Sequence, residues 1–436
     1  TLTVASGATI NNQGTATNFG ATGSASWTTT VKTSSPFTAV AGEGYFVNTT
    51  GGAITVNLPA GTPGAVVAIK DYAGTFDTNE VTLVQNGSDK IGGSTNNKVL
   101  SIEGIAATLI FIDSTQGWLV TDDGLQSTVS PQPYLVDFLV IAGGASGGMH
   151  NAAGAGAGGL RTSFGATSGG GSSAETNLGF VLNTVYTVTI GAGGASQTSD
   201  GAGNAGANSS ISGSGITTIT SIGGGGGGSN EGGDPGGAGG SGGGGGGPGY
   251  SAGAGTANQG YAGGSGNSTQ DLSGGGGAAA AGQAGSDTNY GGAGGAGLQV
   301  NIDGNNYYWA GGGGGAGYGP GDPAGAGGIG GGGGGSGGNS STGGAGGGSA
   351  LNPGGTGDSG SQGGESAGSG GANTGSGGGG KSRAAGGGSG AGGSGIVILS
   401  MPDANYSGTT TGSPTVATGV SGKTVLTFTG SGSYTG

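Results

Sequence analysis

The stretch at residues 221–250 reads SIGGGGGGSNEGGDPGGAGGSGGGGGGPGY, and it decides how the rest of the chain is interpreted. Of the 436 residues, 127 are glycine and only 7% are charged, whereas an average protein has roughly 7% glycine and about 25% charged residues. Most of the glycine lies between residues 143 and 395, and residues 1–142 have the composition of an ordinary β protein. A tract so poor in side chains is either disordered or ordered through its backbone.

Two features of the glycine tract favour order over disorder, although glycine- and serine-rich segments without a period are usually disordered. The apolar segments YLVDFLVIAGG (134–144) and GSGIVILSMP (393–402) frame the tract on both sides. The glycine runs are also similar in length and are separated by breaks that carry Asp, Pro, Tyr or Asn. These runs lie at 223–228, 242–247, 274–277, 311–315 and 330–335.

A backbone-built structure for the tract follows from the chemistry of the peptide group. An extended left-handed helix of the polyproline II type has three residues per turn, rises about 3.1 Å per residue and makes no internal hydrogen bonds. Without side chains, neighbouring helices can approach closely and bond to one another. Each bond contributes only about 0.5–1.5 kcal/mol, against an ordering cost of about 1–2 kcal/mol per residue. We therefore predict a polyglycine II helix array that needs the flanking β core as its anchor.

Outside the glycine tract the sequence pattern is that of β-strands separated by turn residues. Six strands are expected between residues 27 and 127, at 53–59, 65–72, 81–87, 98–102, 107–113 and 117–123. Further strands are expected at 184–194, 216–224, 414–417 and 423–433, in addition to the two framing segments. Their regular spacing is typical of a sandwich or prism. No segment has a helical period.

The predicted fold is therefore all-β, with four parts. Residues 1–26 are expected to be the end of an elongated shaft, 27–127 a β-sandwich or prism domain, and 128–133 a linker. Residues 134–436 are expected to be the glycine-rich domain with its flanking strands.

Composition excludes several functional classes. The net charge is −13 with only 8 basic residues, so no basic stripe is available for nucleic acid. There is no cysteine and one histidine, His150, which excludes thiolate sites and metal sites with several histidines. The 21 acidic residues are scattered along the chain, without a convincing carboxylate pair of the kind that a glycoside hydrolase needs. We expect a non-enzyme without cofactor or metal.

The order of these motifs resembles the glycine-rich domain of tail-fibre proteins from marine and cyanobacterial bacteriophages. The resemblance rests on YLVDFLVIAGGASGG (134–148), AGAGGLRTS (155–163), YTVTIGAGGA (186–195) and GGSGIVILS (392–400). Residues 43–118 also look like a β domain of such fibres. The resemblance implies a homotrimeric, extracellular fibre on the virion. Its implied partners are other phage tail or fibre proteins and a glycan or protein of the host surface.

The distinctive side chains lie in the breaks between glycine runs, where aromatic faces suit sugar rings and loops suit recognition. The receptor-binding candidates are Tyr250, Tyr261, Asp271, Tyr290, Tyr307, Tyr308, Trp309 and Tyr318. Each could instead be an ordinary turn residue. Tyr307, Tyr308 and Trp309 follow the hairpin signal Asp303-Gly304, so they are either a stacking platform or an apolar plug that closes the array.

The sequence therefore predicts a phage tail fibre that acts as an adhesin. Loops displayed by the rigid glycine-rich domain are expected to recognise a host receptor, such as a polysaccharide or an outer-membrane component, without catalysis. The alternatives are a structural fibre spacer that binds no receptor, and a bacterial surface adhesin or matrix protein.

Overall fold

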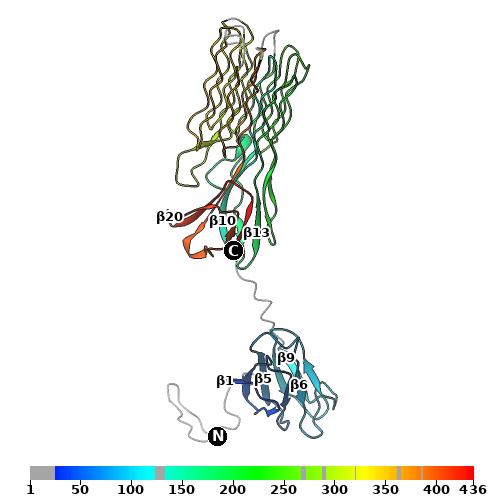
Figure 1. Cartoon of the computed structure of the whole chain (residues 1–436). Coiled ribbons are helices and arrows are strands. Elements are labelled where there is room, and N and C mark those ends of the chain that lie inside the picture. Colours follow the sequence, from blue (N-terminus) through cyan, green and yellow to red (C-terminus); the bar gives the residue numbers. More distant parts are fainter. Residues whose placement is uncertain are drawn as a thin grey trace, which may run out of the picture. The chain divides into compact units, whose positions relative to one another are not determined.

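The computed structural model describes residues 25–122, 133–266, 272–286, 291–319, 321–360, 365–383 and 386–436. It divides into two compact units, Thr1–Pro131 and Gln132–Gly436, which Figure 1 shows in blue to cyan and in green to red. The prediction of an all-β chain is confirmed, because the described residues form strands and two short 3-10 turns but no α-helix. The predicted shaft end lies outside the described residues except for its last two positions, and the predicted linker except for Pro133.

The first unit consists of two sheets that face one apolar core. Its strands are β1 (Ser26–Lys32), β2 (Phe37–Thr38), β3 (Glu43–Val47), β4 (Ile54–Asn57), β5 (Val66–Asp71), β6 (Val81–Val84), β7 (Lys98–Leu100), β8 (Ala106–Phe111) and β9 (Trp118–Asp122). The sheet orders are β1-β3-β5-β8-β9 and β2-β4-β6-β7. Both sheets contribute alternate residues to the core, for example Val67 and Ile69 from one and Val56 and Leu83 from the other. This alternation is what a strand with one buried face requires.

The second unit contains two antiparallel sheets and a hairpin. Its strands are β10 (Tyr134–Ile141), β11 (Leu160–Thr162), β12 (Leu178–Phe180), β13 (Val185–Thr189), β14 (Ser209–Gly213), β15 (Ile219–Ser221), β16 (Leu298–Gln299), β17 (Tyr308–Trp309), β18 (Ile396–Pro402), β19 (Thr410–Thr411), β20 (Thr415–Val420), β21 (Lys423–Phe428) and β22 (Gly432–Thr435). One sheet has the order β11-β10-β18-β21-β20 with β12 also paired to β10, and the other has the order β15-β14-β13-β22-β19.

Strands β10 and β18 are buried on both faces. On one face Phe138, Val140 and Leu399 join an apolar cluster shared with the second sheet. On the other face Leu139 and Ile398 join a separate cluster that includes hairpin residues such as Trp309. Burying each such side chain stabilises the fold by about 1.5–3 kcal/mol. The framing segments of the glycine tract therefore anchor it, because the chain passes directly from β10 into the tract and from the tract into β18.

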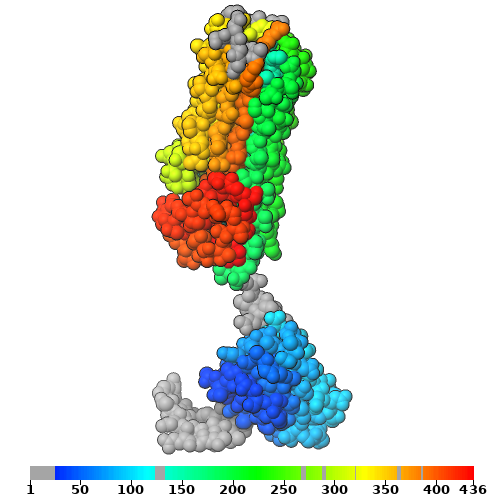
Figure 2. All heavy atoms as spheres, viewed as in Figure 1, coloured from blue at the N-terminus to red at the C-terminus, as the bar shows by residue number. Residues whose placement is uncertain are grey.

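The glycine tract runs back and forth between the sheets and the opposite end of the unit (Figure 1). Its segments lie side by side without being strands. In the space-filling view of Figure 2 they form smooth columns, and the C-terminal strands, in red, make a bulge on their flank. Few side chains project from these columns, because most positions in them are glycine or alanine.

Hydrogen bonds of the glycine segments repeat every three residues, as segment 311–317 illustrates. Its residues 311, 314 and 317 donate to the carbonyls of 330, 333 and 336, residues 312 and 315 to those of 295 and 292, and residues 313 and 316 to those of 155 and 152. The N···O distances in this set are 2.8 to 3.5 Å. A β-strand alternates between two neighbours with a period of two. Segment 311–317 instead donates to three neighbouring segments in turn.

Close approach between the segments requires glycine. A Cβ atom added at Gly313 would lie 2.0 Å from the carbonyl oxygen of Gly378, and one added at Gly333 would lie 2.0 Å from that of Gly368. No real Cβ makes such a contact, so the neighbouring backbone would have to move apart. At the surface the same repeat appears in the burial of segment 341–348, where Ser341, Gly344 and Gly347 are buried and the residues between them are not.

Candidate functional site

The end of the glycine segments farthest from the sheets gathers turns from distant parts of the sequence (Figure 1). We call this end the tip. Its described residues lie at 149–152, 196–202, 229–234, 248–250, 318–319, 321–322 and 338–341. Most of the described charged side chains in the glycine tract lie in or next to these turns, including His150, Asp200, Glu231 and Asp234.

Contacts between the turns fix the tip. The Nδ1 atom of His150 lies 2.5 Å from the Oδ1 atom of Asp200, and the backbone N–H of Ala202 donates to Oδ2 of Asp234 at 3.1 Å. The backbone N–H of Asn230 donates to the carbonyl of Asn151 at 3.1 Å. Three turns are thus tied in a ring. His150 has a left-handed φ of 59°, which is common in turns.

A buried lysine lies next to the tip. Lys381 ends a glycine segment and has no exposed surface. Burial lowers the pKa of Lys381, because the charged amine loses water, while the nearby carboxylates of Glu365 and Asp358 raise it. Glu365 is itself 4% exposed. Lys381 was not among the receptor-binding candidates, although a lysine directly after a run of four glycines is a visible signal in the sequence.

The structure separates the candidate receptor-binding residues into two places. Tyr250 and Tyr318 are half-buried residues of the tip. The hydroxyl of Tyr250 lies beside Gly233, at 3.4 Å from the position that a Cβ atom on Gly233 would occupy. Tyr261 lies at the opposite end, where its hydroxyl approaches Gly171. Asp271 and Tyr290 lie outside the described residues.

The candidates Tyr307, Tyr308 and Trp309 belong to the hairpin of β16 and β17, near the sheets. Trp309 has no exposed surface, donates from Nε1 to the carbonyl of Val300 at 3.0 Å and meets Tyr307 edge to face at 5.8 Å. Tyr307 and Tyr308 are half-buried. These contacts favour the interpretation of Trp309 as a plug that closes the array beside β10.

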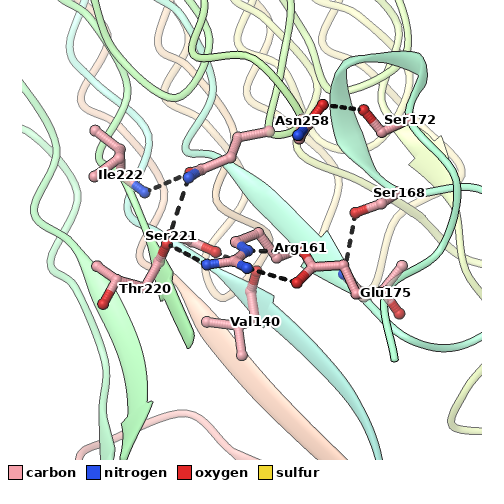
Figure 3. Close-up of polar contacts among 11 residues, drawn as sticks. Val140, Arg161, Ser168, Ser172, Glu175, Thr220, Ser221, Ile222 and Asn258 are labelled. Atoms are coloured by element: carbon pink, nitrogen blue, oxygen red, sulfur yellow. Dashed lines mark hydrogen bonds and ion pairs between the residues drawn. The ribbon is translucent and has the colours of Figure 1, made fainter. Parts of the chain in front are cut away.

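A polar cleft lies on the flank of the unit, between β11, the 168–177 loop, β15 and the turn at 256–260. Figure 3 shows Arg161 at its centre. Arg161 donates from Nε to Oε1 of Glu175 at 2.7 Å, from NH2 to Oε2 of Glu175 at 2.5 Å and from NH1 to the carbonyl of Thr220 at 3.3 Å. Two hollows of 360 and 570 Å³ share this ion pair as a wall. We call the two hollows together the flank cleft.

The described residues contain no group of three or more His, Cys, Asp or Glu side chains that could hold a metal ion. Nor do they contain a helix with the length and apolarity to cross a membrane.

Comparison with known proteins finds a similarity in the first unit. Residues 2–124 match the family model of the bacteriophage T4 gp9/10-like protein, N-terminal. The match supports a bacteriophage tail or fibre-type protein and suggests a component of the virion tail. The matched family is one of structural tail proteins and not an enzyme family. No curated protein matches the chain.

Proposed function

We propose that this phage tail protein is an adhesin that recognises a receptor on the host cell surface through the tip. The observation that carries the proposal is the gathering of turns from separate glycine segments into one surface, tied together by the His150–Asp200, Asn230–Asn151 and Ala202–Asp234 contacts. Binding residues are commonly placed on loops held by a rigid scaffold. Tyr250 and Tyr318 supply aromatic surface there, which suits a sugar ring or an apolar protein side chain.

We further propose that the glycine segments are a polyglycine II array. The three-residue repeat of hydrogen bonds in segment 311–317 supports this, because that helix has three residues per turn. Close packing of such helices makes a stiff support without side chains. The biological form is proposed to be an extracellular homotrimeric fibre, joined to other tail proteins through the first unit, since that unit carries the family match.

The proposal is tested by adsorption experiments with the purified full chain. Tyr250→Ala and Tyr318→Ala together should reduce binding to host cells, and protection of those cells from infection, by about tenfold or more, as loss of central aromatic contacts does at other interfaces. Tyr261→Ala with Tyr308→Ala is the matched control, because these tyrosines lie at the other end of the unit. If the unaltered chain neither binds cells nor blocks infection, the chain is not the adhesin and a structural spacer is the better assignment.

A further inference from the structure

The flank cleft has the size of a ligand site. Its two hollows, of 360 and 570 Å³, fall within the range of about 300–1,000 Å³ that is typical of small-molecule sites. They meet at Arg161 and Glu175, which line both. The cleft is therefore elongated, with one hollow toward the glycine array and one toward the edge of the sheets.

The charge of the flank cleft is balanced within it. Arg161 and Glu175 are the charged residues among those that line the two hollows. The guanidinium holds the carboxylate through two parallel bonds, which is the strong geometry for this pair. Their side chains are 24% and 23% exposed. A phosphate or sulphate would have to compete with Glu175 for Arg161, so the cleft favours a ligand without net charge.

The remaining lining groups suit a ligand rich in hydroxyl groups. The hollow near the array is lined by Ser168, Ser172, Ser173, Asn258 and Gln259. Ser172 donates to Oδ1 of Asn258 at 2.5 Å. That bond uses only the oxygen of the Asn258 amide. The Nδ2 group of Asn258 donates to no described residue, so it is available as a donor to a ligand.

The second hollow adds apolar surface to these polar groups. Leu178, Ile216 and Ile219 line it together with Thr176, Asn177 and Thr217. A sugar presents C–H groups on its ring faces and hydroxyls at its edges, so an apolar strip beside hydroxyl and amide side chains matches it. A purely apolar ligand would leave these polar groups without partners, which is costly.

The walls of the flank cleft are held in place before any ligand binds. The backbone N–H of Ile222 donates to Oε1 of Gln259 at 2.8 Å, and that of Thr162 donates to Oγ of Ser168 at 3.2 Å. Ser221 donates from Oγ to the carbonyl of Val140 at 2.8 Å, which fixes β15 against β10 (Figure 3). A preformed site loses little conformational entropy on binding.

We propose that the flank cleft is a second binding site of this chain, for a neutral oligosaccharide. It is separate from the tip, and the proposal does not depend on the tip being a receptor site. Arg161 and Glu175 would lie across the middle of the bound saccharide, with hydroxyl and amide donors on one side and the apolar strip on the other.

The test uses the full chain on an array of neutral and acidic bacterial oligosaccharides, followed by calorimetry with the best neutral one. Thr217→Trp and Ala257→Trp fill the two hollows from exposed rim positions. We expect the unaltered chain to bind neutral saccharides and the double variant to bind them about tenfold more weakly or worse. Thr342→Trp, at an exposed position on the glycine array, is the matched control and should leave affinity within about twofold.

Three outcomes would overturn the proposal: no binding of neutral saccharides by the unaltered chain, a preference for acidic ones, or unchanged affinity in the double variant. Cell adsorption by the tip variants Tyr250→Ala and Tyr318→Ala is measured in parallel. Loss of adsorption in the tip variants with retained saccharide binding would support both proposals independently. The double variant Thr217→Trp, Ala257→Trp is tested for adsorption as well. If it loses both saccharide binding and cell adsorption while the tip variants keep both, receptor recognition is assigned to the flank cleft and not to the tip.

Discussion

At the scale of the residue, glycine is required by its neighbours rather than by its own dihedral angles. Gly313 is the clearest case, because a Cβ there would lie 2.0 Å from one carbonyl oxygen and 3.2 Å from the backbone nitrogen of Ala155. Both contacts are with backbone atoms, which cannot rotate away as a side chain can. Alanine is accepted elsewhere in the same tract, for example at the exposed position Ala345.

Gly313→Ala should therefore lower the free energy of unfolding by about 3 kcal/mol, which is the upper range for overpacking. Gly348→Ala is the matched control, because nothing lies within 4 Å of its added Cβ. The control should be neutral or stabilising by up to about 1 kcal/mol, since alanine restricts the unfolded chain. Chemical denaturation of the full chain measures both. Equal effects of the two substitutions would mean that the segments are not packed by backbone contact.

The buried Lys381 gives a second prediction at this scale. Its pKa is below the unfolded value of 10.5 in the folded chain, chiefly because of burial. The unfolded chain therefore binds more protons in the window between the folded and unfolded pKa, so stability rises with pH through that window. The nearby Glu365 opposes the shift and stabilises the charged amine.

Glu365→Gln should lower the free energy of unfolding by about 2 kcal/mol at pH 7, the usual size of a lost interaction with a charged group. The difference from the unaltered chain should shrink as the pH rises and Lys381 loses its proton. Denaturation at pH 7 and in the alkaline range measures it. Glu231→Gln, a more exposed carboxylate 4.0 Å from Arg383, should change little at either pH. A constant deficit at every pH would contradict the assigned role of the charge.

At the scale of the element, the three-residue repeat should be visible in amide exchange. In the surface segment 342–348 the N–H groups of Gly344 and Gly347 donate to Gly335 and Gly332. The N–H groups of Ala345 and Gly346 have no acceptor among the described residues.

Exchange measured by nuclear magnetic resonance should be slow at Gly344 and Gly347 and fast at Ala345 and Gly346, because protection follows hydrogen bonding and burial. Every amide of the interior segment 311–317 should be slow. A β-strand would instead protect alternate residues. Exchange at the rate of an unstructured chain throughout both segments would overturn the ordered array.

Strand positions were predictable where apolar residues alternate or form runs, and less so elsewhere. The six strands expected between residues 27 and 127 correspond to β4 to β9, each of which is one to three residues shorter than expected. Strand β1 was missed because its sequence, SWTTTVK, is mostly polar and exposed. Strand β14 was missed because SSISG carries a single apolar residue, Ile211, which packs in the core.

The candidate site was less predictable than the fold, because the sequence does not say which end of a glycine segment a break occupies. Tyr250 and Tyr261 lie eleven residues apart in the sequence yet at opposite ends of the array, since one short glycine-rich segment runs between them. The flank cleft was not predicted either. Its ion pair joins Arg161 to Glu175 across a loop, and neither residue lies in a recognisable motif.

At the scale of the whole molecule, the two units have different origins of stability and, we infer, different partners. The first unit has a conventional apolar core and carries the similarity to phage tail proteins. The second unit presents the tip and the flank cleft. We infer that the first unit attaches the chain to the phage tail and that the second unit displays the tip and the flank cleft.

These two roles predict how the chain is oriented on the phage particle. Labelling can test the orientation, because the chain has no cysteine of its own and an introduced one would be the single labelling site. One variant, Thr198→Cys, carries a single cysteine in an exposed turn of the tip, and the other, Thr62→Cys, carries one at an exposed position of the first unit. Either cysteine can be labelled with gold in assembled phage. Gold on the Thr62→Cys chain should lie close to the tail body, and gold on the Thr198→Cys chain farther from it, as electron microscopy of single particles would measure. Both variants change exposed residues, so stability should be unaffected within about 0.5 kcal/mol. The reverse order of labels would place the glycine-rich unit at the tail, where the tip would face other virion proteins instead of the host.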